Sequence, residues 1–187
     1  FDSIVIATHG DEALAMLEDA SPEERTLLGA FKYAKNRAVL HTDAAFMPRR
    51  EPLWASWNYV GDNPDGGCVV TYWMNKLQNI RSKEQIFLTL NPRSEPRPES
   101  VLYETNYDHP VFNAAAIRAQ EQLWSLQGAR NTWFCGAHFG SGFHEDGLQS
   151  GLAVAEQLGG VRRPWTVENE SGRIHLAPLH QRPALAA

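Results

Sequence analysis

The sequence predicts an α+β fold in which an antiparallel sheet is flanked by two terminal β-loop-α units. Near the end of the chain, Thr132–Glu156 has the pattern of an apolar strand, a glycine-rich loop and a helix opening at Gly147. At the start, the apolar run Ile4–Ala7 leads into Thr8-His9-Gly10. The region between them is rich in Val, Trp, Tyr, Thr and Phe and broken by Pro and Gly, which favours antiparallel strands.

The N-terminal elements are predicted in order from their residue patterns. Ile4–Ala7 is a short continuous apolar run, which indicates a strand buried on both faces. Asp11 is expected to cap a helix over about residues 12–18. Ser21-Pro-Glu-Glu24 combines a cap, a first-turn proline and a glutamate that completes a capping box, so it predicts a helix reaching about Tyr33.

The middle and the end of the chain follow from strand composition and turn residues. Gly61–Gly67 is expected to join two strands as a hairpin, and Pro92–Pro98 is expected to be a loop. Gly159-Gly160 should stop the last helix, which is predicted to run over Gly147–Leu158. The further elements expected are strands over 37–47, 54–60, 68–77 and 85–90, a helix over 112–126, a strand at Trp133, and a tail over 162–187 with one candidate hairpin at Ser171-Gly172.

Composition narrows the class of protein. The 187 residues can form one good domain or two small ones, and 43% hydrophobic with 21% charged residues is ordinary for a globular protein. A net charge of −5 argues against a general nucleic-acid or anionic-membrane binder, because such binding rests on clustered Lys and Arg. No apolar run approaches the roughly 20 residues of a membrane span. Two cysteines favour a reducing cytoplasm, and the start at Phe1-Asp-Ser suggests a trimmed chain.

The glycine-rich loop is the main candidate for a cofactor site. The first N–H groups of a helix are unsatisfied and carry partial positive charge, and glycines allow a ligand to approach the backbone. The dinucleotide pattern G-x-G-x-x-G is absent, because Gly140-Ser-Gly142 is followed by Glu145 at the third glycine position. A tight structural turn is the alternative interpretation. Two parallel strands alone cannot form a doubly wound sheet, so further strands are expected from an upstream portion of the chain.

Trp133–Ala137 and Glu145–Glu156 resemble the C-terminal FAD-binding segment of the flavin-containing amine oxidase and phytoene desaturase superfamily. Phe1–Gly10 is similar to the late strand of the same FAD domain, and the most similar subgroup is one of bacterial predicted NAD/FAD-binding oxidoreductases. The resemblance implies that an upstream Rossmann-like unit holds the ADP half of a non-covalent FAD. It divides the chain into a late FAD-domain segment over 1–20, a substrate domain over 21–128, the C-terminal FAD segment over 129–160 and a tail over 161–187.

The resemblance also implies a set of site residues. Gly136–Gly142 would lie along the ribitol and pyrophosphate, and the amides of Gly147 and Leu148 would face the flavin. The acidic residue usual in the superfamily after the first glycine is replaced by Ala137. The cofactor-binding residues expected are Thr8, His9, Gly10, Gly136, Ala137, Phe139, Gly140, Gly142, Phe143, Asp146, Gly147 and Leu148.

Trp57, Tyr59 and His144 are the expected substrate contacts. Trp57 and Tyr59 would share one face of a strand, which is either the inner face of a sheet or part of an apolar pocket. No metal is expected, because His138, His144, Glu145 and Asp146 match no usual zinc spacing. Cys135 is interpreted as a buried thiol.

The function implied is hydride transfer from a substrate C–H bond to flavin N5 in a cytoplasmic FAD-dependent oxidoreductase, with no catalytic residue assigned. The substrate would be a hydrophobic or amine small molecule, and a homodimer is left open. Two alternatives remain: a non-catalytic α+β binding or interaction module, and an FAD-dependent desaturase or isomerase acting on a lipid or polyene.

Overall fold

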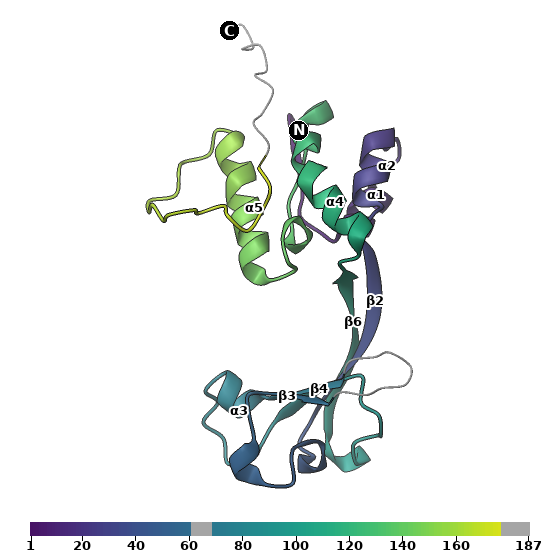
Figure 1. Cartoon of the computed structure of the whole chain (residues 1–187), viewed down its shortest axis with the longest axis vertical. Helices are drawn as coiled ribbons and strands as arrows, with labels where there is room; N and C mark the ends of the chain where they lie inside the picture. The colour runs from purple at the N-terminus through teal and green to yellow at the C-terminus, as the bar shows by residue number, and fades with distance from the viewer. Residues whose placement is uncertain (61–68, 177–187) are drawn as a thin grey trace, which may run out of the picture. The chain divides into compact units, whose positions relative to one another are not determined.

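The computed structural model describes residues 1–60 and 69–176. The chain divides into two compact units, one formed by Phe1–Tyr33 with Pro110–Ala187 and the other by Ala34–His109 (Figure 1). We call them unit 1 and unit 2. This division differs from the expected domain limits, because residues 21–33 and 110–128 belong to unit 1 together with both chain ends.

Unit 1 contains a two-stranded parallel sheet and four helices among its described residues. The strands β1 (Ile4–Ile6) and β7 (Thr132–Phe134) pair in parallel, with Val5 opposite Trp133. The two terminal β-loop-α units therefore come together, as expected. The helices are α1 (Gly10–Met16), α2 (Pro22–Leu28), α4 (Ala114–Leu123) and α5 (His144–Gln157), with short 3-10 turns η4 (Trp124–Leu126), η5 (Ala129–Asn131) and η6 (Ala137–Phe139).

The core of unit 1 lies between the helices and β7. Phe31, Leu123, Trp124 and Phe134 are almost completely buried there. The prediction that β1 is buried on both faces is wrong, because Ile4 is 56% exposed and Val5 is 45% exposed. In the described part of the chain β1 has β7 as a neighbour on one side only, so it forms an edge strand.

The capping box at Ser21 is confirmed. The Ser21 hydroxyl accepts from the Glu24 amide at 3.1 Å, and the Glu24 carboxylate accepts from the Ser21 amide at 2.7 Å. The helix ends at Leu28 and not near Tyr33, because strand β2 (Lys32–His41) follows after a short turn. The cap of α1 is His9 and not Asp11, which lies inside the first turn of that helix.

The start of α5 is also corrected. The helix begins at His144, three residues before the predicted Gly147. The carboxylate of Asp146 accepts from the Phe143 amide at 2.8 Å and so caps the helix, while the Gly147 amide donates to the Phe143 carbonyl at 3.3 Å. The Gly147 amide is therefore a bonded group within the first turn of the helix.

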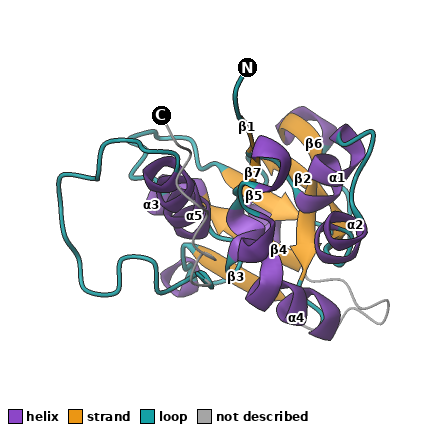
Figure 2. Ribbon diagram, turned by 90° about the horizontal axis from the view of Figure 1, so that it is seen from above, coloured by secondary structure: helices purple, strands orange, loops and turns teal. Residues whose placement is uncertain are grey.

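Unit 2 is built on a five-stranded antiparallel sheet with the order β3-β4-β5-β2-β6, which confirms the antiparallel middle of the chain (Figure 2). Val60 pairs with Val69, as a hairpin requires, while the predicted turn over Gly61–Gly67 lies outside the described residues. Strand β6 was not predicted, and residues 74–77 form a helix instead of extending a strand. The bounds are β3 (Trp57–Val60), β4 (Val69–Trp73), α3 (Met74–Leu77), β5 (Phe87–Leu90) and β6 (Val101–Val111), with 3-10 turns η1 (Ala44–Phe46), η2 (Glu51–Leu53) and η3 (Pro98–Ser100).

The two faces of this sheet differ in character. One face is buried and carries a polar chain, in which His41 Nε2 lies 2.8 Å from Thr89 Oγ1 and Thr89 Oγ1 lies 2.9 Å from Thr71 Oγ1. The opposite face is apolar and partly open. By strand alternation and register it carries Trp57, Tyr59, Val70, Tyr72, Leu88, Leu90, Leu40 and Ala38.

The C-terminal region after α5 is irregular as far as Leu176. Residues 161–176 contain no strand, so the candidate hairpin at Ser171-Gly172 is not formed; the Gly172 amide instead closes a turn onto the Asn169 carbonyl at 2.8 Å. Among the described residues, no helix is both long and apolar enough to cross a membrane.

Candidate functional site

The loops that follow β1 and β7 meet at one edge of the parallel sheet. The carboxyl ends of parallel strands lie at the same edge, and this is where open α/β sheets bind ligands. A Cβ atom added at Gly136 would lie 3.0 Å from the Thr8 carbonyl oxygen and 2.8 Å from Nδ1 of His138. With a φ of 154° as well, this position requires glycine, and its absent side chain lets the two loops touch.

The first loop is held by Tyr33. The Gly10 amide donates to the Tyr33 hydroxyl at 2.8 Å, and the His9 ring stacks on the Tyr33 ring with centroids 4.4 Å apart. Burial raises the pKa of Tyr33 to about 12, so the phenol stays protonated at neutral pH. Gly10 is buried, and a Cβ there would meet the Leu28 carbonyl at 3.4 Å.

The second loop is fixed by α5. The Gly136 amide donates to the Ser150 hydroxyl at 3.0 Å, and this hydroxyl lies 3.0 Å from the Gly147 carbonyl oxygen. A Cβ at Gly147 would lie 3.6 Å from the amide nitrogen of Ala137, which is ordinary contact. We call the group formed by Thr8, His9, Gly10, Gly136, Ala137 and Gly147 the carboxyl-end site; all of these except Gly10 are partly exposed.

His138 lies directly beneath the carboxyl-end site and was considered from the sequence only as a metal ligand. It is 3% exposed, and its Nε2 has no hydrogen-bond partner in the described part of the chain. Burial, with a smaller contribution from His9, lowers the pKa of His138 to about 4, so the ring is neutral at pH 7. Gln120 holds this loop by donating to the His138 carbonyl at 2.9 Å and to the Gly140 carbonyl.

Besides Gly10, three of the expected cofactor contacts are buried, and they are held by packing or bonding within unit 1. Phe139 packs against Trp124 with ring centroids 6.0 Å apart. Asp146 is fully buried and pairs with Arg173 at 2.7 Å, and a Cβ at Gly140 would lie 2.5 Å from its carboxylate. The expected contact between Asp146 and a cofactor is therefore replaced by helix capping and an ion pair.

The remaining expected residues of unit 1 lie around the start of α5. Phe143, His144 and Leu148 are exposed, and Gly142 lies against Phe112. Leu148 lines a pocket of about 300 Å³ between α5 and the segment after it, and does not line the carboxyl-end site. The other residues lining that pocket are Glu145, Gln149, Leu152, Arg163, Trp165, Val167, Glu168, Asn169, Glu170 and Arg173.

The two expected substrate contacts of unit 2 lie on the open apolar face of its sheet. Trp57 is 59% exposed and Tyr59 is 68% exposed, while Asn58 points to the other face and donates to Sδ of Met47 at 3.4 Å. The shared face of Trp57 and Tyr59 is thus confirmed. It is the partly open face of the sheet and not its buried one.

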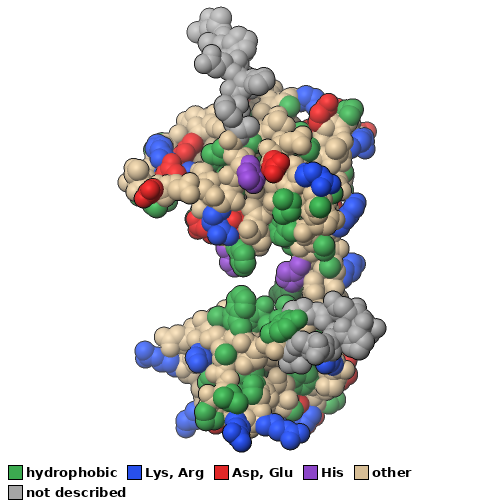
Figure 3. All heavy atoms as spheres, viewed as in Figure 1, with side chains coloured by type: hydrophobic (Ala, Val, Ile, Leu, Met, Phe, Trp, Pro, Cys, Tyr) green, Lys and Arg blue, Asp and Glu red, His purple; other side chains and the backbone are tan. Residues whose placement is uncertain are grey.

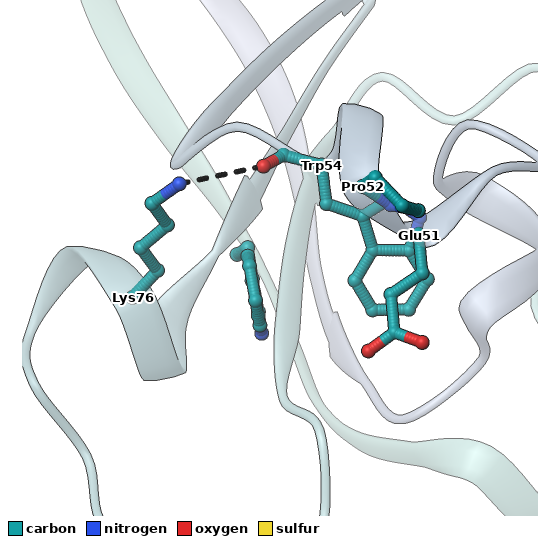
Figure 4. A pocket seen from close by; sticks show the side chains of 5 residues that line it. Glu51, Pro52, Trp54 and Lys76 are labelled. Carbon is teal, nitrogen blue, oxygen red and sulfur yellow. Dashed lines mark hydrogen bonds between the residues drawn. The ribbon is translucent and has the colours of Figure 1, made fainter.

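A separate pocket of about 380 Å³ opens in unit 2 between η2 and α3 (Figure 4). Its walls include the indole rings of Trp54 and Trp73, whose centroids are 5.4 Å apart at an interplanar angle of 87°. Lys76 reaches across it, with Nζ 3.5 Å from the Trp54 carbonyl oxygen. Glu51 and Pro52 complete the lining.

The chemistry that the carboxyl-end site offers is binding by backbone groups and small side chains. Burial raises the pKa of the Cys135 thiol, which makes it a poor nucleophile. No group of three or more His, Cys, Asp or Glu side chains among the described residues is placed to hold a metal ion. Comparison of the chain with known protein families and with functionally characterised sequences gives no match.

Proposed function

We propose that the chain is the C-terminal part of an FAD-dependent oxidoreductase and that the carboxyl-end site contacts the cofactor. The observation that carries the proposal is the parallel pairing of β1 with β7, in which each residue lies opposite one 128 positions later, as Ile4 does opposite Thr132. This pairing brings the loops after both strands to one sheet edge. The exposed apolar residues Ile4 and Val5 support a further strand beside β1, supplied by an upstream Rossmann-like portion.

The residues of the carboxyl-end site fit a large, partly polar cofactor. Gly136 lets two loops approach to contact distance, and Gly147 leaves the Ala137 amide uncovered by a side chain. The neutral His138 and the protonated Tyr33 add no charge to the floor of the site. When bound, FAD would accept a hydride at N5 from a substrate C–H bond; the protein would position it and exclude water.

Two glycines of α5 provide a matched test of the site. In a longer chain that includes the upstream portion, we expect Gly147→Val to weaken FAD binding, because its branched side chain would cover the Ala137 amide. Gly151→Val, one turn later, is the control, since a Cβ there has no neighbour within 4 Å. Both variants place the same residue in the same helix, so the helix-propensity cost is alike.

The readout is the FAD dissociation constant, measured by the quenching of flavin fluorescence on titration. The proposal expects a loss of about tenfold or more for Gly147→Val, corresponding to about 1.4 kcal/mol, and affinity near wild type for Gly151→Val. Wild-type affinity in both variants would contradict a cofactor at this site. A loss of the same size in both variants would also contradict it, since that result points to helix destabilisation alone.

For the substrate, we favour a hydrophobic molecule over an amine. The open face of the unit 2 sheet places Trp57, Tyr59, Val70, Leu88 and Leu90 together, and none of these paired, described residues carries a carboxylate that could pair with an ammonium group. This favours the desaturase or isomerase alternative, acting on a lipid or polyene, within the same FAD-dependent class.

A fluorescent polyunsaturated fatty acid tests this preference. We expect Tyr59→Glu to reduce its binding, because a charge would then stand on the apolar face. Tyr103→Glu, at an exposed tyrosine on β6, is the matched control. Unchanged binding in Tyr59→Glu, or displacement of the fatty acid by a long-chain amine but not by a neutral alcohol, would contradict the preference.

A further inference from the structure

The tryptophan pocket of unit 2 is surrounded by a surface that combines basic and exposed apolar side chains. Residues 49–54 and 73–86 form it, and we call it the tryptophan-pocket surface. The two segments adjoin because both line the pocket, and the second closes on itself where Asn75 Oδ1 accepts from the Ile86 amide at 2.7 Å. Five basic residues, Arg49, Arg50, Lys76, Arg81 and Lys83, stand here against the two acidic residues Glu51 and Glu84.

Two leucines on this surface are exposed. Leu53 is 64% exposed and Leu77 is 42% exposed, and each is next in sequence to a residue that lines the pocket, Trp54 and Lys76 respectively. The indole N–H groups of both tryptophans donate within the unit, to the Pro48 carbonyl and the Gln85 side chain, each at 2.7 Å. Figure 3 shows basic side chains beside hydrophobic ones on this unit.

We propose that the tryptophan-pocket surface docks onto an anionic phospholipid bilayer. Exposed Leu side chains beside half-buried Trp rings, with Lys and Arg in the same segments, are the composition of a peripheral membrane contact. The apolar groups enter the headgroup region and the cations pair with lipid phosphates. The whole chain has a net charge of −5, but this sum does not reveal the local excess of positive charge on the tryptophan-pocket surface. The proposal does not depend on flavin binding.

Vesicle co-sedimentation of the whole chain tests the proposal. We expect binding to vesicles of phosphatidylcholine with phosphatidylglycerol, and little to phosphatidylcholine alone. Each lost basic residue should weaken partitioning about fivefold, so Arg49→Gln with Arg50→Gln should give roughly 25-fold. Leu53→Ser should weaken it about tenfold through lost apolar burial. All three side chains are exposed, so the fold should persist, which circular dichroism checks.

Matched controls lie elsewhere on the same unit. Lys35→Gln removes a basic charge and Leu102→Ser removes an exposed leucine from β6, and both should leave partitioning unchanged. Absence of binding to anionic vesicles, or equal losses in the control variants, would overturn the proposal. So would binding to heparin as strong as binding to vesicles together with an unaffected Leu53→Ser variant, since that pattern indicates a general polyanion contact.

Discussion

At the scale of single residues, Gly136 and Gly147 constrain the carboxyl-end site in different ways. Gly136 has a positive φ, and an added side chain would overlap both His138 and Thr8. Gly147 has helical geometry and room for a methyl group. The sequence could predict a special role for glycine in this loop, but it could not distinguish a glycine that the backbone requires from one that only leaves space.

This difference predicts opposite effects of the same substitution. Gly136→Ala should lower the free energy of unfolding by about 1–3 kcal/mol, through backbone strain and overlap. Gly147→Ala should raise it by up to about 1 kcal/mol, because alanine is the better helix former. Urea unfolding of both variants beside wild type measures the two values; destabilisation of the same size in both would refute the described geometry.

His138 should make the stability of unit 1 depend on pH. Its folded pKa is about 4, below the ordinary value of 6.5, so the unfolded chain binds the proton first as the pH falls. The stability contributed by the neutral ring is therefore complete above about pH 6.5 and is lost as the pH falls toward 4. Below about pH 4, where the loss is complete, the free energy of unfolding is lower by about 3 kcal/mol, which corresponds to the difference between the folded and the ordinary pKa.

The measurement is the pH dependence of the free energy of unfolding between pH 7 and 4. The His138→Gln variant should show a shallower slope over this range than wild type, whatever its stability at pH 7. His175→Gln, at an exposed histidine of the same unit, is the control and should keep the wild-type slope. Parallel curves for wild type and His138→Gln would show that the ring titrates normally.

At the scale of elements, local signals predicted those whose geometry is set locally. The Ser21 capping box and the alternation of Trp57 and Tyr59 are examples, because each depends on residues close in sequence. The start of α5 was placed three residues late, because Asp146 caps it through a side-chain bond that no glycine signals. Strand β6 escaped prediction because its mostly exposed residues carry little hydrophobic pattern.

The edge strand β1 yields a prediction at this scale. If an upstream strand lies beside β1 in the longer chain, the amides of residues 4–6 should be protected from hydrogen exchange there and exchange faster in residues 1–187 alone. The amides of β7, which lies on the other side of β1 from the proposed strand, should change less. Exchange followed by mass spectrometry makes the comparison; equal rates for β1 in the two chains would argue against a strand beside it.

At the scale of the whole molecule, the chain consists of an antiparallel unit inserted into a unit made from both ends of the sequence. Sequence reasoning predicted this nesting from the order of the β-loop-α units. It misplaced the limits, because α2 and α4 pack against each other although 85 residues separate them. Long-range packing of this kind leaves no local trace in a single sequence.

The most direct test of the central claim is the flavin content of two chains. FAD is titrated into residues 1–187 and into a longer chain that carries the upstream portion, and bound flavin is measured by its absorbance after gel filtration. We predict weak or absent binding to residues 1–187, because the proposal assigns the ADP half of FAD to the upstream portion, and stoichiometric yellow protein for the longer chain. Stoichiometric flavin on residues 1–187 alone, or a longer chain that stays colourless, would contradict the account.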